Sequence, residues 1–409
     1  FGSRLSPGHS WGSVPGCQDV PRGGRAMRDH GCCSSGICAL FGWGPWARRG
    51  RRGPPEPPSA EDMALLQSIS ERSLVEMLSD GSSSGPSCSS FSTQSDACGL
   101  TAFKSKPVLR EGAAGGPAAG GLACRKCLRP DSPNQDAALL LRADGDVTLC
   151  GVFDGHGPKG HEVADFVRDT LPRLVVRDAR FGGDRREMHR VLQEAFWRTQ
   201  AMISALDHEG RLDAKESGTT ATVAVHDRRG GRLTVAHAGD SACVLGRGPT
   251  GGRCTAKLLT TAHRPGLGQE RQRIERAGGR VALGGCGGQR VYAREGGGPG
   301  LAVSRTLGDL ASHDACGVTA QPATLDWDLE AEDQVLLLGS SGLWRFVEPR
   351  EAMECLGAYG AEEAQAAAER LAALALDNWI REDGDAVDPQ GRQGMVYDIT
   401  VLVIGLRDS

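Results

Sequence analysis

The sequence predicts a layered α+β domain, because runs of short apolar strands are followed by pairs of amphipathic helices. An Asp-Gly pair at residues 144–145 separates two apolar runs, which is the pattern of a β-hairpin. Apolar residues then recur at helical spacing over residues 163–174 and again over residues 188–203. Further strands with turn residues between them follow at residues 219–226, 232–238 and 242–246. This order favours antiparallel strands covered by helices.

The first hairpin is expected to bring two aspartates to one end of a sheet. Its strands are residues 137–141 and residues 147–153, so that Asp136 stands just before the first strand and Asp154 just after the second. Antiparallel pairing brings these two ends together. The two helices that follow are amphipathic, and we expect them to cover a face of the sheet.

The second half of the domain adds two helices and two strands. A helix over residues 269–277 should end at Gly278, since glycine is favoured directly after a helix. Residues 335–338 are a short apolar run typical of a buried strand. Residues 362–379 form an alanine-rich helical pattern, and residues 399–404 form a last strand that closes the domain.

Residues 1–123 are expected to form a low-complexity, disordered tail ahead of one domain at residues 124–409. The 409-residue chain contains 58 glycines and 21 prolines, and much of its first part has too few apolar side chains for a core. A helical stripe at residues 62–78 predicts one short docking helix. Because the chain begins with Phe1 and later methionines are alternative starts, the translation of residues 1–62 is left open.

Composition excludes several classes of protein. A net charge of −4 with 24% charged residues favours neither a nucleic-acid partner nor a membrane surface. No run reaches the roughly 20 apolar residues of a spanning helix. We therefore expect an intracellular monomer, in the cytoplasm or the nucleus. Arginines at residues 48–53 leave a nuclear or RNA-binding tract as an alternative, although disorder is favoured there.

The fourteen cysteines predict reduced thiols rather than a zinc site. Cys124 and Cys127 form a CxxC pair, but no second pair with metal-ligand spacing accompanies them. Cys150, Cys243 and Cys316 stand in apolar or small-residue runs, where a free cysteine packs as a small hydrophobe.

The turn at residues 153–157 is the strongest sign of chemistry. It holds Asp154 and His156, a carboxylate and an imidazole, next to Gly155 and Gly157, which allow the backbone to approach a ligand closely. This arrangement suits a metal ligand beside a proton donor. Taken alone, the motif is equally compatible with an ordinary turn after a strand.

Six motifs in order make this chain similar to a known family. They are Asn-Gln-Asp at residues 134–136, FDGHG at 153–157, SGTTAT at 217–222, AGDS at 238–241, GLAVSRTLGD at 300–309 and GLW at 342–344. Together, over about residues 124–409, they resemble the type 2C metal-dependent protein serine/threonine phosphatases, and most closely the plant and protist members. The resemblance implies a four-layer α-β-β-α sandwich with two central antiparallel sheets.

The resemblance also implies hydrolysis of phosphoserine and phosphothreonine in proteins by a metal-activated water. Two Mg²⁺ or Mn²⁺ ions would bind the attacking water and neutralise the phosphate. By motif, Asp154 would bridge both ions, the Gly155 carbonyl would bind one, and Asp136 would hold bound water. His156 would protonate the leaving serine oxygen.

Other family positions are matched less completely. Asp240 and Asp309 correspond to positions near a further, weaker metal. The phosphate-binding arginine that many members carry shortly before the first aspartate is displaced, because counting without gaps puts Asp131 there. Arg125 and Arg129 are the alternatives.

Two departures weaken the expected metal site. Where the family has metal-binding aspartates, this chain has Ser341 and Tyr397. Asp398 follows directly, but in a strand its side chain would point to the face opposite that of Tyr397, so we do not expect it to substitute. We therefore expect a phosphatase with a weak first-metal site and impaired activity. The alternatives are an active enzyme completed by water or by a shifted Asp398, and a pseudophosphatase that acts as a phosphoprotein-binding or regulatory module.

Overall fold

The computed structural model describes residues 58–71, 88–90, 120–126, 132–143, 147–249, 252–284, 288–294, 300–357, 364–383 and 397–407. The helices in these ranges are α1 (Ala60–Glu71), α3 (Gly160–Val176), α4 (Arg185–His208), α5 (Gly268–Ala277), α6 (Leu310–Cys316), α7 (Ser341–Trp344), α8 (Pro349–Leu356) and α9 (Ala364–Asp383). The strands are β1 (Cys88–Ser90), β2 (Gly120–Arg125), β3 (Asp136–Ala143), β4 (Val147–His156), β5 (Gly218–Thr219), β6 (Ala221–Asp227), β7 (Arg232–Ala238), β8 (Ala242–Arg247), β9 (Thr255–Leu258), β10 (Arg280–Leu283), β11 (Gln289–Tyr292), β12 (Leu307–Gly308), β13 (Ala323–Asp328), β14 (Asp333–Gly339) and β15 (Ile399–Gly405).

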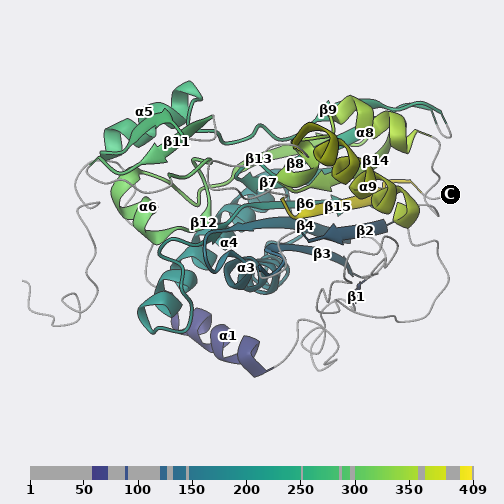
Figure 1. Cartoon of the computed structure of the whole chain (residues 1–409). Coiled ribbons are helices and arrows are strands. Elements are labelled where there is room, and N and C mark those ends of the chain that lie inside the picture. Colours follow the sequence, from purple (N-terminus) through teal and green to yellow (C-terminus); the bar gives the residue numbers. More distant parts are fainter. Residues whose placement is uncertain are drawn as a thin grey trace, which may run out of the picture. The chain divides into compact units, whose positions relative to one another are not determined.

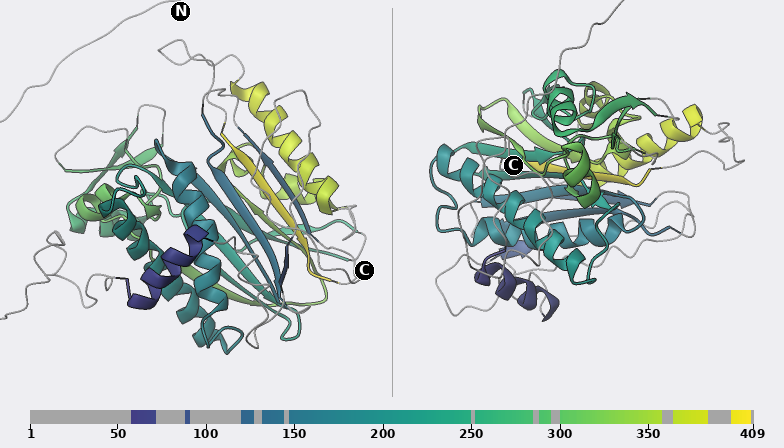
Figure 2. Two further views of the ribbon diagram at one scale, coloured as in Figure 1. Left: turned by 90° about the horizontal axis from the view of Figure 1, so that it is seen from below. Right: turned by 90° about the vertical axis from the view of Figure 1, so that its left-hand side faces the viewer.

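Two antiparallel sheets stack between helices, as expected (Figure 1). The first sheet has the order β1-β3-β4-β6-β7-β13, with β5 and β12 attached beside β4, and the second has the order β2-β15-β14-β8-β9. In Figure 2, α3 and α4 cover the outer face of the first sheet, and α9 covers the outer face of the second. The four-layer α-β-β-α sandwich is therefore confirmed.

Three apolar cores hold these layers together. The first lies between the first sheet and helices α3 and α4, and includes the fully buried side chains of Phe153 and Phe196. The second fills the space between the two sheets, where Val152, Leu245 and Leu402 are buried. The third packs the second sheet against α7, α8 and α9. Each core forms because alternate residues of a strand point to opposite faces of its sheet.

The expected elements are present, with local reasons for where they end. Helix α4 begins after Asp184, whose carboxylate accepts a hydrogen bond from the amide of Glu187, while the Glu187 side chain accepts from the amide of Asp184. Helix α5 ends at Gly278, which has a left-handed φ of 101°. The predicted turn at residues 144–145 lies outside the described residues, although β3 and β4 pair as the predicted hairpin.

Helix α1 lies within the range that was expected to form a disordered tail. It begins at a capping box formed by Ser59 and Asp62. Asp62 is buried and makes an ion pair with Arg198 of α4, and Leu65 joins the core beneath α4. Figure 2 shows α1 against the helical layer. Strand β2 also begins before residue 124. The remaining tail calls, including the cysteines and arginines of its first part, fall outside the described residues.

Within the described ranges, every helix is too short or too polar to cross a bilayer.

Candidate active site

The β3–β4 hairpin sets the centre of the site. Asp136 and Asp154 are directly opposite each other in the antiparallel pair, as the sequence predicted. The amide of Asp154 donates to Thr220 Oγ1 at 3.1 Å, which fixes the end of β4. Gly155 is required next, because a Cβ there would lie 2.4 Å from the carbonyl oxygen of Gln135. The tight backbone approach therefore explains the glycine in the turn.

Asp136 is buried against other carboxylates. Its Oδ2 accepts a hydrogen bond from Thr400 Oγ1 at 2.7 Å, whereas its Oδ1 is buried without a hydrogen-bond partner among the described residues. Burial, followed by the negative charges of Asp154 and Asp398, holds the pKa of Asp136 well above its usual range. A cation at this position would relieve that repulsion.

His156 is held in place by the carboxylate of Asp309. Its Nε2 lies 2.7 Å from Oδ2 of Asp309. Burial alone would lower the pKa of His156, but the charge and hydrogen bond of Asp309 raise it to about 9. Asp309 has the left-handed φ of 46°, which is costly for a residue other than glycine. This backbone conformation turns its carboxylate toward the imidazole.

Asp240 adds a further acid next to this pair. Burial and then the charge of Asp154 raise the pKa of Asp240 to about 6, although Arg264 and His156 act in the opposite direction. The six-motif resemblance placed Asp240 and Asp309 together near a weaker metal. Both carboxylates raise the pKa of His156, and Asp309 also contacts its imidazole directly.

Ser341 stands beside Asp154, as expected, but it contributes its backbone. Its amide donates to Oδ2 of Asp154 at 2.8 Å, and Ser341 opens the short helix α7. A neutral N–H therefore occupies one lone pair of the carboxylate that the resemblance assigns to both metals.

Tyr397 packs away from the acids. Its side chain lies against the core between the second sheet and helices α7 to α9. The Tyr397 hydroxyl accepts a hydrogen bond from Arg345 Nη1 at 3.1 Å, and the guanidinium lies 5.0 Å from the centre of the ring. A positive side chain and a phenol thus occupy the place where the family has a carboxylate.

The side chain of Asp398 is directed toward the site, which we did not expect, although a shifted Asp398 was one of the alternatives. The expected opposition of Tyr397 and Asp398 is present, but Asp398 is the one directed toward the acids. Its Oδ2 accepts from the amide of Gln135 at 2.8 Å, and its charge raises the pKa of Asp136. The signal was available in the sequence, because Asp398 and Thr400 are two residues apart and so share a face.

The structure describes only one of the other predicted site positions. Arg125 ends β2 and is paired with Ile399, close to the segment that carries Asp398. Arg129, Asp131 and Cys127 lie outside the described residues.

The chemistry of the donor set fits a divalent cation, although two of the expected carboxylates are replaced by Ser341 and Tyr397. In the part of the chain that the structure describes, no three His, Cys, Asp or Glu side chains are arranged to hold a metal ion. The orphaned Oδ1 of Asp136 and the raised pKa values of Asp136 and Asp240 are nevertheless typical of carboxylates that gather around a cation. Asp136, Asp154 and Asp398 therefore bring carboxylates to the site, while Ser341 and Tyr397 bring none.

Comparisons with known proteins agree with the motifs and the fold. Residues 127–383 match the family described as "Protein phosphatase 2C". Probable protein phosphatase 2C 48 of Oryza sativa subsp. japonica is 36% identical over 283 residues, covering 62% of this chain and 77% of that protein. Probable protein phosphatase 2C 34 of Arabidopsis thaliana is 33% identical over 267 residues, covering 61% and 72%.

Solved structures share the fold. The serine-threonine phosphatase 2C of Toxoplasma gondii superposes with a TM-score of 0.58 at 18% identity, covering 70% of this chain and 94% of that one. A C. elegans sex determining protein superposes with a TM-score of 0.57 at 20% identity, covering 75% and 68%. The expected likeness to plant and protist proteins is therefore confirmed.

Proposed function

The chain belongs to the protein phosphatase 2C family, and on that premise we propose that it is a protein serine/threonine phosphatase of impaired activity. Its substrates would be phosphoserine and phosphothreonine in proteins. The family is metal-dependent, so the domain would require Mg²⁺ or Mn²⁺. The domain, expected at residues 124–409, would also include the start of β2 at Gly120, and helix α1 precedes it.

The acids and the histidine would divide the work. Asp136, Asp154 and the Gly155 carbonyl would hold a divalent ion, which when bound would acidify a water and neutralise the phosphate. His156 would be protonated at neutral pH, because Asp309 stabilises the imidazolium. Its Nε2–H donates to Asp309, so the proton on Nδ1, which has no acceptor among the described residues, is the one available to the leaving serine oxygen.

The observation that carries the proposed impairment is the pair of substituted ligand positions. Ser341 offers Asp154 an N–H, and Tyr397 is bound to Arg345 instead of facing the acids. Metal affinity at oxygen sites depends on the number of charged ligands. With neither position supplying a carboxylate, a second ion would be weakly held and the water poorly activated.

The test restores the missing carboxylates. With Mn²⁺ and a phosphothreonine peptide, the wild-type domain should be at least about 10-fold slower than the Ser341→Asp/Tyr397→Asp double variant, a loss typical of weakened metal sites. The two single variants separate the positions, and Asp398→Asn reports whether the neighbouring acid contributes. Equal rates for the wild type and the double variant would contradict the impairment.

A pseudophosphatase remains the second candidate, favoured by the lack of a three-ligand cluster among the described residues. In that role the cleft would bind phosphoproteins without turnover. Titration calorimetry with Mn²⁺ distinguishes the two: one weak site together with tight phosphothreonine-peptide binding and no phosphate release supports the pseudophosphatase. Two tight Mn²⁺ sites with steady phosphate release support the enzyme.

A further inference from the structure

A cavity that includes none of the acids of the candidate active site lies at the start of α5. Its volume is about 390 Å³. Its walls come from the end of β7, the start of α5 and the first residues of β13, which is the edge strand of the first sheet. Leu259, Leu267 and Leu325 make part of its lining apolar, and Gln269 lies among its polar residues. The cavity is large enough for a small organic group.

The amino end of α5 opens on this cavity without a cap. Leu267 occupies the N-cap position and offers no side-chain hydrogen bond. The amides of residues 268–270 have no acceptor among the residues that the structure describes. The first amides of a helix, together with its dipole, attract negative charge. The ten-residue helix therefore presents unused donors to whatever enters the cavity.

Two stacked imidazoles form the opposite wall. The rings of His237 and His263 lie 4.4 Å apart and nearly parallel. The amide of Gly239 donates to Nδ1 of His263 at 3.2 Å, so the proton of the neutral ring is on Nε2 and can be donated. His237 is only 5% exposed, lines the cavity, and has no hydrogen-bond partner at Nδ1 among the described residues.

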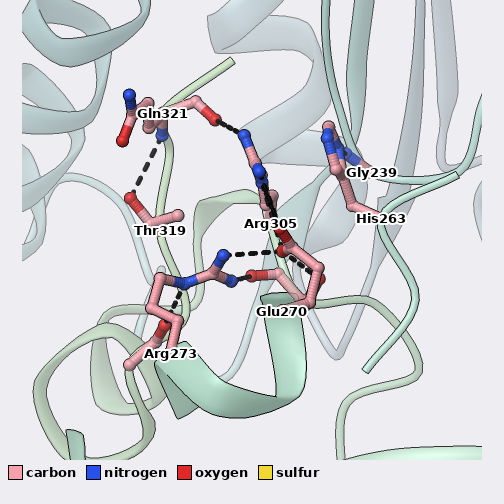
Figure 3. A network of polar contacts seen from close by, with 9 residues as sticks. Gly239, His263, Glu270, Arg273, Arg305, Thr319 and Gln321 are labelled. Atoms are coloured by element: carbon pink, nitrogen blue, oxygen red, sulfur yellow. Dashed lines mark hydrogen bonds and ion pairs between the residues drawn. The ribbon is translucent and has the colours of Figure 1, made fainter. Parts of the chain in front are cut away.

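The charged residues in the cavity lining are Glu270 and Arg305, which form an ion pair. Glu270 is the carboxylate in the lining, and Figure 3 shows that it is shared by two arginines. Arg305 Nη2 donates to its Oε1 at 2.6 Å, and Arg273 Nη1 donates to its Oε2 at 2.7 Å. Ser304 Oγ also donates to Oε2. Burial lowers the pKa of His237 to about 4, with the charge of Arg305 acting in the same direction and that of Glu270 in the opposite one, so the ring is neutral at pH 7.

We propose that this cavity is an anion-binding site for the carboxylate or phosphate group of a small ligand or of an acidic peptide. The oxyanion accepts from the first amides of α5 and from the imidazole of His263, while the three leucines contact the apolar part of the ligand. The inference does not depend on the proposed catalysis, because none of these residues belongs to the acid cluster.

The site adjoins two segments that carry candidate catalytic residues. His263 is bonded in both directions to Gly239, whose neighbour is Asp240. Arg305 lies four residues before Asp309 in the sequence. An anion bound between α5 and His263 therefore contacts the histidine that fixes Gly239, the neighbour of Asp240.

A charge change at the cavity mouth tests the proposal without removing a buried residue. Gln269 is exposed in the first turn of α5, where a carboxylate is favourable for the helix itself. Gln269→Glu should weaken anion binding about 3-fold, the effect of one like charge at roughly 6 Å through water, because the Gln269 side chain is exposed. Gln269→Lys should strengthen it. Gln272→Glu, on the exposed side of the same helix, is the matched control.

Binding is measured by NMR of histidine-labelled, full-length protein, titrated with inorganic phosphate and separately with a glutamate-rich peptide that lacks phosphoserine. The ring signals of His237 and His263 report the cavity, and that of His156 reports the acid cluster. Saturable shifts at His237 and His263, with an affinity that is lowered by Gln269→Glu and not by Gln272→Glu, support the site. Binding of phosphate but not of the peptide indicates that the ligand is a free anion. Tighter binding of the peptide than of phosphate indicates an acidic partner. Shifts confined to His156, or equal affinities in the two glutamate variants, overturn it.

Discussion

Replacing Glu270 by glutamine should destabilise the domain in a way that depends on pH. The side chain is 5% exposed and accepts hydrogen bonds from Arg273, Ser304 and Arg305. Burial by itself would raise the pKa of Glu270, but hydrogen bonds from Arg305 and Ser304 and the charge of Arg273 lower it from 4.5 to about 2. The charged form is therefore stabilised by the fold.

The size and sign follow from linkage. A folded-state pKa about 2.5 below the unfolded value contributes about 3 kcal/mol to the free energy of unfolding at pH 7. Because the folded pKa is depressed, this stability is present above pH 4.5 and is lost as the pH falls toward 2. Glutamine resembles the protonated acid. The stability difference between wild type and Glu270→Gln should therefore shrink from about 3 kcal/mol at pH 7 to about 1.5 kcal/mol at pH 3.

Urea unfolding followed by circular dichroism, at several pH values between 7 and 3, measures this difference directly. Glu275→Gln is the control, since Glu275 pairs with Arg271 on the exposed face of the same helix and should change stability by less than about 1 kcal/mol at any pH. A difference for Glu270→Gln that stays constant across the pH range would refute the ion-pair argument and leave only a packing effect.

Three further outcomes are expected. Asp62→Asn should weaken the docking of α1 by about 1–3 kcal/mol, because it leaves Arg198 without its charged partner. Limited proteolysis should then cut within α1. The control Glu61→Gln, at an exposed position, should stay protected. Gly218→Ala should displace Asp309, since the new Cβ would lie 2.2 Å from its Oδ2; an unchanged His156 NMR signal would contradict this. Phe196→Ala should cost about 3–5 kcal/mol by opening a cavity under α4, measured as a lower urea midpoint with an unchanged slope.

The fold could be predicted from the sequence because the patterns that indicate its helices and strands are local. Helical spacing identified α3 and α4, and the paired apolar runs identified β3 and β4 with the correct register for Asp136 and Asp154. Helix α5 ends at Gly278, as predicted from the glycine there, and that glycine adopts the left-handed conformation. Such features depend on neighbours along the chain, which a sequence displays directly.

The candidate site could be predicted from the sequence only in part, because its contacts join residues that are far apart in the chain. The bond between Thr400 and Asp136 joins residues that are 264 positions apart, and no local pattern announces it. The pairing of Arg345 with Tyr397 and the position of Asp398 depend on where β15 begins. Those bonds form because two sheets pack face to face. The resemblance implied the two sheets, but it did not show which residues meet between them.

The position of β15 bears on how the domain folds during synthesis. This strand, at residues 399–405, lies between β2 and β14 and also supplies the hydroxyl that binds Asp136. The first sheet needs nothing beyond β13, so it can form while the ribosome is still translating the remainder. The second sheet must wait for about 280 residues of chain between its two adjacent strands, a separation that slows folding. Until then β2 has no partner strand and β14 lacks one of its two neighbours, and these unpaired backbone groups are what a nascent-chain chaperone would protect.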